Sequence, residues 1–239
     1  MQPAAMIALF LGALLMAAPD GHAHDPASQG EKKPDAHGGP AQHGKHGKHG
    51  NPDDMAEYIA KMEEPGRAAW QRPDEVVRAL GLKAGQTACD IGAGPGYFSL
   101  RLAAAVGPAG RVYAVDVEPE ILAALRERLQ KGTARNVTPV LALPDDPLLP
   151  AAACDLVLVV DTWHHFPDGV AYLKALVRAL KPGGRVVNID FLPGAPVGPG
   201  ADHRVSKERF LADAARGGLV AVAEHAFLPY QYFVVLQAK

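Results

Sequence analysis

The sequence predicts an α/β fold with a doubly wound, mostly parallel sheet. Three observations support this. Short apolar runs alternate with helix-like runs over residues 87–239. The run at 154–161 (CDLVLVVD) is almost continuously apolar, as expected for a parallel strand buried on both faces. Three closely spaced glycines follow the first apolar run, where a strand can turn tightly into a helix.

The elements follow in a regular order. We expect the first five strands at residues 87–91, 112–115, 137–142, 154–161 and 186–190. Two further strands, at 219–227 and 231–237, should form a pair at one sheet edge. The expected helices cover residues 74–80, the alanine- and leucine-rich run after Gly96, a segment that starts at Glu118-Pro119, and residues 170–180 and 207–216.

The turn after the first strand has the pattern of a nucleoside pocket. It reads Asp90-x-Gly92-x-Gly94-x-Gly96, so the backbone can approach a ligand with no side chain in the way. The amides of the following helix then point at that ligand. Asp116, at the tip of the next strand, is placed to accept hydrogen bonds from a ribose.

The glycine spacing separates two cofactor classes. In the dinucleotide pattern the third glycine would fall at position 97, which is Tyr97, and this opposes an NAD(P) oxidoreductase. The pattern with Asp90 instead resembles the first motif of class I S-adenosylmethionine (SAM) methyltransferases. The runs VDTWHHF at 160–166 and LKPGGRVV at 180–187 are similar to the same places in that family.

The resemblance covers roughly residues 65–239, and the segment before the first motif is similar to an exported, uncharacterised subgroup. Quinone-biosynthesis methyltransferases are related. The resemblance implies a Rossmann-like, seven-stranded, mostly parallel sheet with an antiparallel strand at one edge. It also implies S-adenosyl-L-methionine as cofactor and transfer of its methyl group to a small-molecule acceptor (EC 2.1.1 class).

The resemblance also assigns the cofactor contacts. The methionine part is expected on the first motif, the ribose on the acid after the second strand, and the adenine amino group on one of two adjacent acids. These residues are Asp90, Gly92, Gly94, Gly96, Asp116, Asp145 and Asp146. Two alternatives remain open: Asp145 and Asp146 form a turn between prolines, or Asp116 only organises the turn that follows its strand.

Three residues after the fourth strand are candidates for catalysis. His164 and His165 follow Asp161 at the carboxyl end of that strand, where open sheets bind ligands. One histidine is expected to act as general base, because its pKa suits proton transfer near neutrality. Asp161 is expected to contact the methionine amino group or to orient a histidine ring. In the alternative, the histidine pair is a structural feature of the family.

Composition limits the other possibilities. The chain has 239 residues, 48% of them hydrophobic, which suits one sizeable domain. Its formal charge is −2 and it has no basic stripe with interleaved aromatics, so nucleic acid is not expected as a partner. Cys89 and Cys154 are expected in central strands as buried thiols rather than as a disulfide or a catalytic pair.

The first 23 residues have the pattern of a signal peptide. An apolar run at 6–18 precedes Gly21 and Ala23, small residues that suit a cleavage site. The run is short for a stable membrane span. A periplasmic or secreted protein is therefore expected, although no Lys or Arg precedes the run. The alternatives are an uncleaved anchor, or a start at Met55 that would leave the protein in the cytoplasm.

Residues 24–54 are rich in His, Gly and Pro, and a disordered linker is expected there. His43, His46 and His49 recur every three residues, a spacing that suits weak binding of a divalent transition metal, whereas no metal site is expected in the domain. The alternative for this segment is a solvated tether. The second candidate function is therefore an exported His-rich metal-handling protein, whose SAM-binding module has little or no activity.

The domain is expected to begin after a covering segment. Residues 55–82 are expected to form an N-terminal lid, and residues 83–239 the methyltransferase domain. Trp70 is a candidate wall of the pocket, or it packs the lid onto the core.

Overall fold

The structure is a computed structural model that describes residues 54–239. The expected signal peptide (1–23), all but the last residue of the linker (24–54) and His43, His46 and His49 lie outside the described residues. Three short helices precede the sheet: α1 (Met55–Met62), α2 (Arg67–Gln71) and α3 (Pro73–Leu80).

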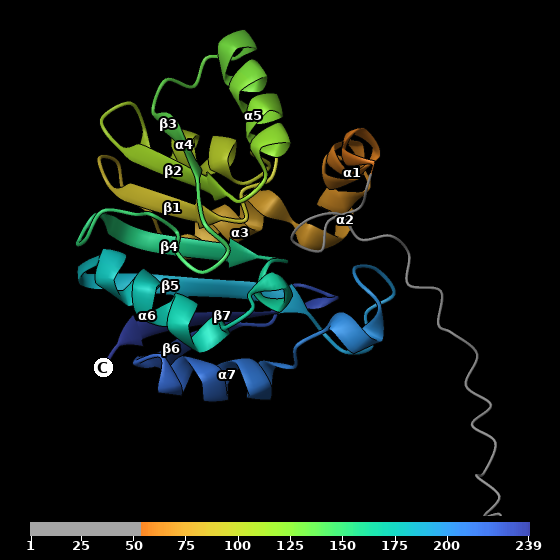
Figure 1. Cartoon of the computed structure of the whole chain (residues 1–239), viewed down its shortest axis with the longest axis vertical. Helices are drawn as coiled ribbons and strands as arrows, with labels where there is room; N and C mark the ends of the chain where they lie inside the picture. The colour runs from red at the N-terminus through yellow and green to blue at the C-terminus, as the bar shows by residue number, and fades with distance from the viewer. Residues whose placement is uncertain (1–53) are drawn as a thin grey trace, which may run out of the picture. The chain divides into compact units, whose positions relative to one another are not determined.

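Seven strands form one sheet in the order β3-β2-β1-β4-β5-β7-β6 (Figure 1). The first five pair in parallel, and β7 pairs antiparallel with both β5 and β6. This confirms the expected doubly wound, mostly parallel Rossmann-like sheet, with β7 inserted between β5 and the edge strand β6. The strands are β1 (Thr87–Ile91), β2 (Arg111–Asp116), β3 (Val137–Leu141), β4 (Cys154–Val160), β5 (Leu180–Phe191), β6 (Leu219–His225) and β7 (Gln231–Ala238).

Helices cover both faces of the sheet. One core cluster joins the sheet to α3 and α4 through Val76, Leu80 and Leu102, and the other joins it to α6 and α7 through Leu176 and Phe210. Short 3-10 turns, η2 and η3, precede α6 and α7. The bounds are α4 (Ser99–Val106), α5 (Pro119–Lys131), η2 (Trp163–His165), α6 (Gly169–Ala179), η3 (Ala201–His203) and α7 (Lys207–Arg216).

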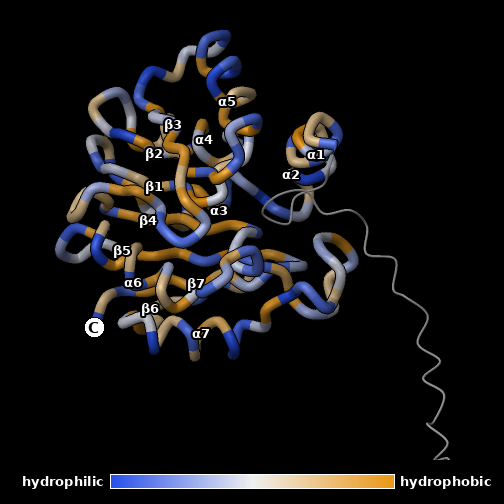
Figure 2. Tube along the Cα trace, viewed as in Figure 1, coloured by the Kyte–Doolittle hydropathy of each residue, from blue (hydrophilic) through white to orange (hydrophobic). Residues whose placement is uncertain are grey.

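Strand β4 shows why its sequence is so uniformly apolar. Leu156 and Leu158 pack into the cluster on the α4 side, while Val157 and Val159 pack into the cluster on the α6 side. Both faces of the strand are therefore in the core, and Figure 2 shows the central strands as the most hydrophobic part of the trace.

Strand β5 begins earlier than expected. Leu180 already pairs with Cys154, and the register then shifts so that Arg185 pairs with Leu156. Gly183 takes a left-handed φ of 77° within this shift, a conformation that glycine adopts readily. The Lys181–Gly184 segment is thus an irregular start of the strand, rather than a separate turn before it.

The expectation of two buried thiols is wrong. Cys89 and Cys154 form a disulfide between neighbouring strands, with Cα atoms 6.1 Å apart. Cys89 itself pairs with Val157. The register irregularity between Cys154 and Leu156 turns the Cys154 side chain into the same core cluster as Cys89, and the chain has no free cysteine.

Candidate cofactor and acceptor site

The turn after β1 can be built only with glycine at its key positions. Gly92, Gly94 and Gly96 have φ values of 67°, 56° and 95°, a region that other residues seldom adopt. A Cβ on Gly92 would lie 2.2 Å from Thr162 Oγ1, and one on Gly96 would lie 2.6 Å from Leu125. The turn is therefore packed against both α5 and the segment that follows β4.

Asp116 links this glycine turn to the next helix. Its Oδ2 accepts a hydrogen bond from the Gly94 amide at 2.9 Å, and its Oδ1 accepts one from the Glu118 amide at 3.0 Å. The residue is 8% exposed, and burial raises its pKa although the amide bonds oppose that shift. The Val117 amide also contributes a hydrogen bond, and the carboxylate, with about four acceptor positions, keeps room for a hydroxyl group.

Asp90 lies behind the turn. It is 2% exposed, and its Oδ2 accepts a hydrogen bond from the Ser99 hydroxyl at 2.6 Å. Burial raises the pKa of Asp90 to about 7, and the charge of Asp116 adds to the shift. Asp90 therefore supports the first residue of α4 from within the sheet.

The N-terminal helix lies directly on the glycine turn. The Met62 sulfur is 3.0 Å from the position a Cβ on Gly94 would take. Burial raises the pKa of the Tyr58 phenol, and the charges of Asp116 and Asp161 raise it further. Both acids therefore lie near Tyr58, so α1 packs on the glycine turn and beside the acid after β2.

Arg67 holds this covering segment in place. Its Nη1 donates to the Met62 carbonyl at 2.8 Å, and its Nη2 lies 3.4 Å from Asp161 Oδ2. The guanidinium stacks over the Tyr97 ring at 4.3 Å. Arg67 thus connects α1 to the glycine turn and to the end of β4.

Asp161 is the centre of a buried polar network. It accepts hydrogen bonds from Gln71 Nε2, at 3.2 Å, and from Gln231 Nε2. Burial raises the pKa of Asp161 to about 7 and Asp190 contributes, while Arg67 opposes the shift. Its φ of 53° is unusual for a residue other than glycine and directs the chain into η2.

The two candidate histidines differ in their surroundings. The His164 side chain is 8% exposed, with Nδ1 3.5 Å from Asp190 Oδ2, whereas His165 lies at the surface. The rings are adjacent, with centroids 4.2 Å apart. Desolvation by the surrounding protein lowers the pKa of His165 to about 4, with smaller contributions from His164 and His203.

The expected adenine acids lie in a turn. Leu143 and Asp146 exchange backbone hydrogen bonds, and Asp146 Oδ1 accepts from the Leu148 amide at 2.8 Å. Asp145 is exposed. These contacts agree with the turn alternative for Asp146 and leave Asp145 open to a ligand.

Several residues of this region carried no clear sequence signal. Arg67, Gln71 and Gln231 act through contacts distant in sequence. Asp190 is the last polar residue of an apolar run, a position that by itself indicates no function.

Arg204 donates five hydrogen bonds to carbonyls of the loop at 192–199, so it organises that loop. Trp70 packs on Phe191 with ring centroids 5.7 Å apart, which is the packing role expected as one of its two alternatives.

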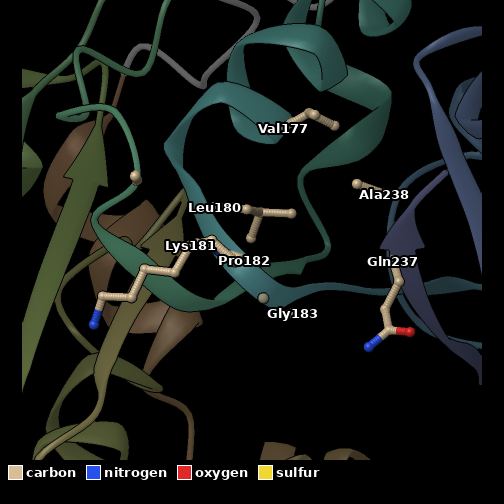
Figure 3. A pocket seen from close by; sticks show the side chains of 9 residues that line it. Val177, Leu180, Lys181, Pro182, Gly183, Gln237 and Ala238 are labelled. Carbon is tan, nitrogen blue, oxygen red and sulfur yellow. The ribbon is translucent and has the colours of Figure 1, made fainter.

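Figure 3 shows a hollow at the opposite end of the strands from the glycine turn, where β5 begins and β7 ends. Val177, Leu180 and Gln237 line it together with the irregular start of β5. Lys181 is the ionisable side chain among the lining residues, and its Nζ donates to Asp155 at 2.6 Å. This hollow is remote from the carboxyl ends of the parallel strands, where the residues described above gather.

Residues 88–184 match the family described as "Methyltransferase domain". The matched region runs from β1 to the start of β5 and contains the glycine turn, Asp116, Asp161 and both histidines. The chain carries a class I SAM-dependent methyltransferase domain.

Relatives of this methyltransferase domain agree. It is 32% identical to a ubiquinone/menaquinone biosynthesis C-methyltransferase of Ectopseudomonas mendocina over 130 residues, and this match covers 54% of this chain and 50% of the relative. It is 32% identical over 123 residues to a protein-L-isoaspartate O-methyltransferase of Ignicoccus hospitalis, which covers 51% and 56%. The chain therefore spans about half the length of the curated relatives it matches.

A solved structure extends the likeness over more of the chain. A SAM-dependent methyltransferase from Aquifex aeolicus superposes with a TM-score of 0.74 at 26% identity, covering 78% of this chain and 99% of that structure. These matches favour a methyltransferase over the metal-handling alternative, and they imply SAM as the cofactor.

The residues of this methyltransferase domain fit that cofactor. The glycine turn carries no side chain at Gly92, Gly94 and Gly96, so a ligand can approach its backbone, whose amides already donate within the fold, and Asp116 lies beside that turn. Within residues 54–239 no cluster of three or more His, Cys, Asp or Glu is arranged to hold a metal ion. Among the same residues, no helix has the length and apolar character needed to cross a bilayer.

Proposed function

We propose that this protein transfers the methyl group of SAM to a small-molecule acceptor by direct displacement. The observation that carries the proposal is the meeting of two features at one sheet edge. The glycine turn with Asp116 forms a cofactor grip, and Thr162, which precedes His164, packs on Gly92 of that turn. The turn that would bind a nucleoside thus adjoins a histidine that could accept a proton.

The residues divide into binding and acid–base roles. Bound SAM supplies an electrophilic methyl group on a sulfonium. Asp116 accepts the ribose hydroxyls, the side-chain-free backbone of the glycine turn packs against the methionine part, and Asp145 or Asp146 meets the adenine amino group. Asp161 faces the amino group of the methionine part. A histidine of the 164–165 pair takes the proton that the acceptor loses.

Most of the rate would come from positioning. The attacking atom must be held about 3 Å from the methyl carbon and in line with the departing sulfur, and this orientation supplies a large part of the barrier reduction. The segment formed by α1 and α2 lies over the site and excludes water, which strengthens the electrostatic interactions inside it.

The proposal places the protein in an oxidising compartment. The disulfide between Cys89 and Cys154 supports this, because such bonds persist in secreted and periplasmic proteins and are rare in the cytosol. The apolar run at 6–18 supports export independently.

Calorimetry on the purified full chain tests the cofactor. SAM and S-adenosylhomocysteine should bind, and NAD should not. Asp116→Ala should weaken binding of both by about tenfold or more, since a charged hydrogen-bond acceptor is lost. Asp145→Ala and Asp146→Ala decide the adenine contact: the variant that weakens binding identifies it. Absence of binding to the wild type would refute the proposal.

The acceptor class is tested with labelled methyl groups. Transfer from methyl-labelled SAM is measured to catechol, aniline and a substituted hydroquinone, which offer oxygen, nitrogen and carbon acceptors. The similarity to quinone-biosynthesis C-methyltransferases makes the hydroquinone the first choice.

A further inference from the structure

A buried acid stands beside one of the two histidines. Asp190, at the carboxyl end of β5, is 1% exposed, and His164 in η2 has a side chain that is 8% exposed. Asp190 Oδ2 lies 3.5 Å from His164 Nδ1, and neither atom has another hydrogen-bond partner among the described residues. The pair joins two strands that end at the candidate site.

The orientation of the carboxylate is fixed from the other side. Asp190 Oδ1 accepts the Phe191 amide at 2.8 Å, which leaves Oδ2 directed at the imidazole. A buried polar atom with no partner costs free energy, so these two atoms have reason to share a proton. Hydrogen bonds of catalytic groups are often long before ligands bind and shorten afterwards.

We propose that Asp190 is a positioning residue that keeps the proton of neutral His164 on Nδ1, so that Nε2 is the atom that accepts a proton from the methyl acceptor. This inference rests on the proposed function and deepens it. It selects His164 rather than His165 as the base, and it adds a residue that the sequence pattern did not single out.

The surroundings separate the two histidines. His165 lies at the surface and has no carboxylate within ion-pair distance among the described residues, whereas His164 has Asp190 beside its Nδ1. The groups that act on this region from neighbouring elements are Asp161 of the β4 end, His203 of η3 and Tyr232 of β7. None of these three is paired with His164, whereas Asp190 lies 3.5 Å from its Nδ1.

The proton transfer defines the class of acceptor. An electron pair of the acceptor atom, a lone pair on oxygen or the pair that an acidic carbon keeps when its proton leaves, forms a bond to the methyl carbon; the carbon–sulfur bond breaks, and its electron pair remains on sulfur. The acceptor proton passes to His164 Nε2, and the imidazolium is stabilised by the Asp190 carboxylate. The acceptor therefore carries a proton on its attacking atom, as a hydroxyl or an acidic carbon does, unlike a tertiary amine or a thioether, which need no base.

Nitrogen NMR of histidine-labelled full-length protein tests the pair, with S-adenosylhomocysteine as the bound probe. In the wild type, neutral His164 should carry its proton on Nδ1. In Asp190→Asn the amide can donate to Nδ1, so the proton should move to Nε2, the wrong tautomer for a base. His164→Gln assigns the signal, and His165→Gln is the matched control, in which His164 keeps its proton on Nδ1.

The outcomes separate this inference from the proposed function. A wild-type His164 with its proton on Nε2 overturns the inference, and so does an unchanged tautomer in Asp190→Asn. If Asp190→Asn does not fold, the wild-type spectrum alone decides. If the wild type fails to bind S-adenosylhomocysteine, the proposed function fails, and the tautomer is then read on the free protein. With whichever of the three acceptors the wild type methylates, Asp190→Asn should lower kcat by about 10²-fold or more without weakening cofactor binding; equal kcat values would contradict the inference.

Discussion

Cys89 and Cys154 are joined by a disulfide that ties β1, the strand before the glycine turn, to its neighbour β4 within the core. Both residues are 0% exposed. The bond joins residues 65 positions apart, and the loop it closes contains the end of β1 together with β2 and β3. The covalent link therefore spans the part of the domain that forms the cofactor site.

Loss of this bond should destabilise the protein. On the chain-entropy model, a loop of 65 residues corresponds to about 4 kcal/mol. The Cys89→Ala/Cys154→Ala double variant should lose roughly 2–4 kcal/mol of unfolding free energy in urea. The control is the wild type with reductant: because both sulfurs are buried, reductant alone should leave the folded protein oxidised, and reduction should require denaturant. Equal urea midpoints for wild type and double variant would contradict the prediction.

Asp90 should make stability depend on pH. Burial raises its folded-state pKa from 3.8 to about 7, so the folded state binds a proton that the unfolded state has already released. Stability is therefore fully present below about pH 4 and decreases as the pH rises to about 7, by up to about 4 kcal/mol. Asp90→Asn removes this dependence.

The measurement is the difference in unfolding free energy between Asp90→Asn and wild type at several pH values. Other titrating groups cancel in this difference. The unfolding free energy of Asp90→Asn relative to that of the wild type should rise between pH 4 and pH 7 and then stay constant. A difference independent of pH would show that the Asp90 carboxyl ionises normally in the folded protein.

The fold was predictable because its signals are local. The continuous apolar run of β4 follows from burial on both faces, and Gly92, Gly94 and Gly96 follow from left-handed backbone angles that other residues avoid. The helix expected at 207–216 is α7, and Ser206 caps it by accepting the Arg209 amide at 3.3 Å. In each case the residue acts on its own element.

The features that were missed depend on contacts between distant residues. The disulfide required a register irregularity between Cys154 and Leu156, without which Cys154 would not face Cys89. The approach of Asp190 to His164 depends on how two strand ends lie side by side, and the bond from Gln71 to Asp161 on how α2 packs. Periodicity and motif spacing do not specify such distances.

Arg204 should control the order of the loop at 192–199. Its guanidinium donates to the carbonyls of Leu192, Pro193, Ala195, Val197 and Pro199, at distances from 2.8 to 3.3 Å. Arg204→Lys retains the charge but not the planar fork, so it should free most of these carbonyls. We expect faster amide exchange in the loop and a loss of about 1–3 kcal/mol in stability. Arg209→Ala is the control, since its pair with Asp213 is largely exposed on the arginine side; an equal effect of both changes would contradict the special role of Arg204.

Arg67 should determine how readily α1 leaves the cofactor site. Its ion pair with Asp161, its bond to the Met62 carbonyl and its stacking on Tyr97 all hold the covering segment down. Arg67→Ala leaves Asp161 without its cationic partner. The packing of α1 and α2 over the glycine turn should then lose about 1–3 kcal/mol of stabilising free energy. Amide exchange over residues 55–71 should therefore accelerate, while amide exchange in α7 should not change.

Ligand association gives a second measurement. Since α1 lies on Gly94 and beside Asp116, it must move to admit a nucleoside, so the association rate constant of Arg67→Ala for S-adenosylhomocysteine should rise by about tenfold. Arg72→Ala, which removes only an exposed pair with Glu75, should change neither quantity. An Arg67→Ala variant that binds at the wild-type rate would show that α1 does not gate the site.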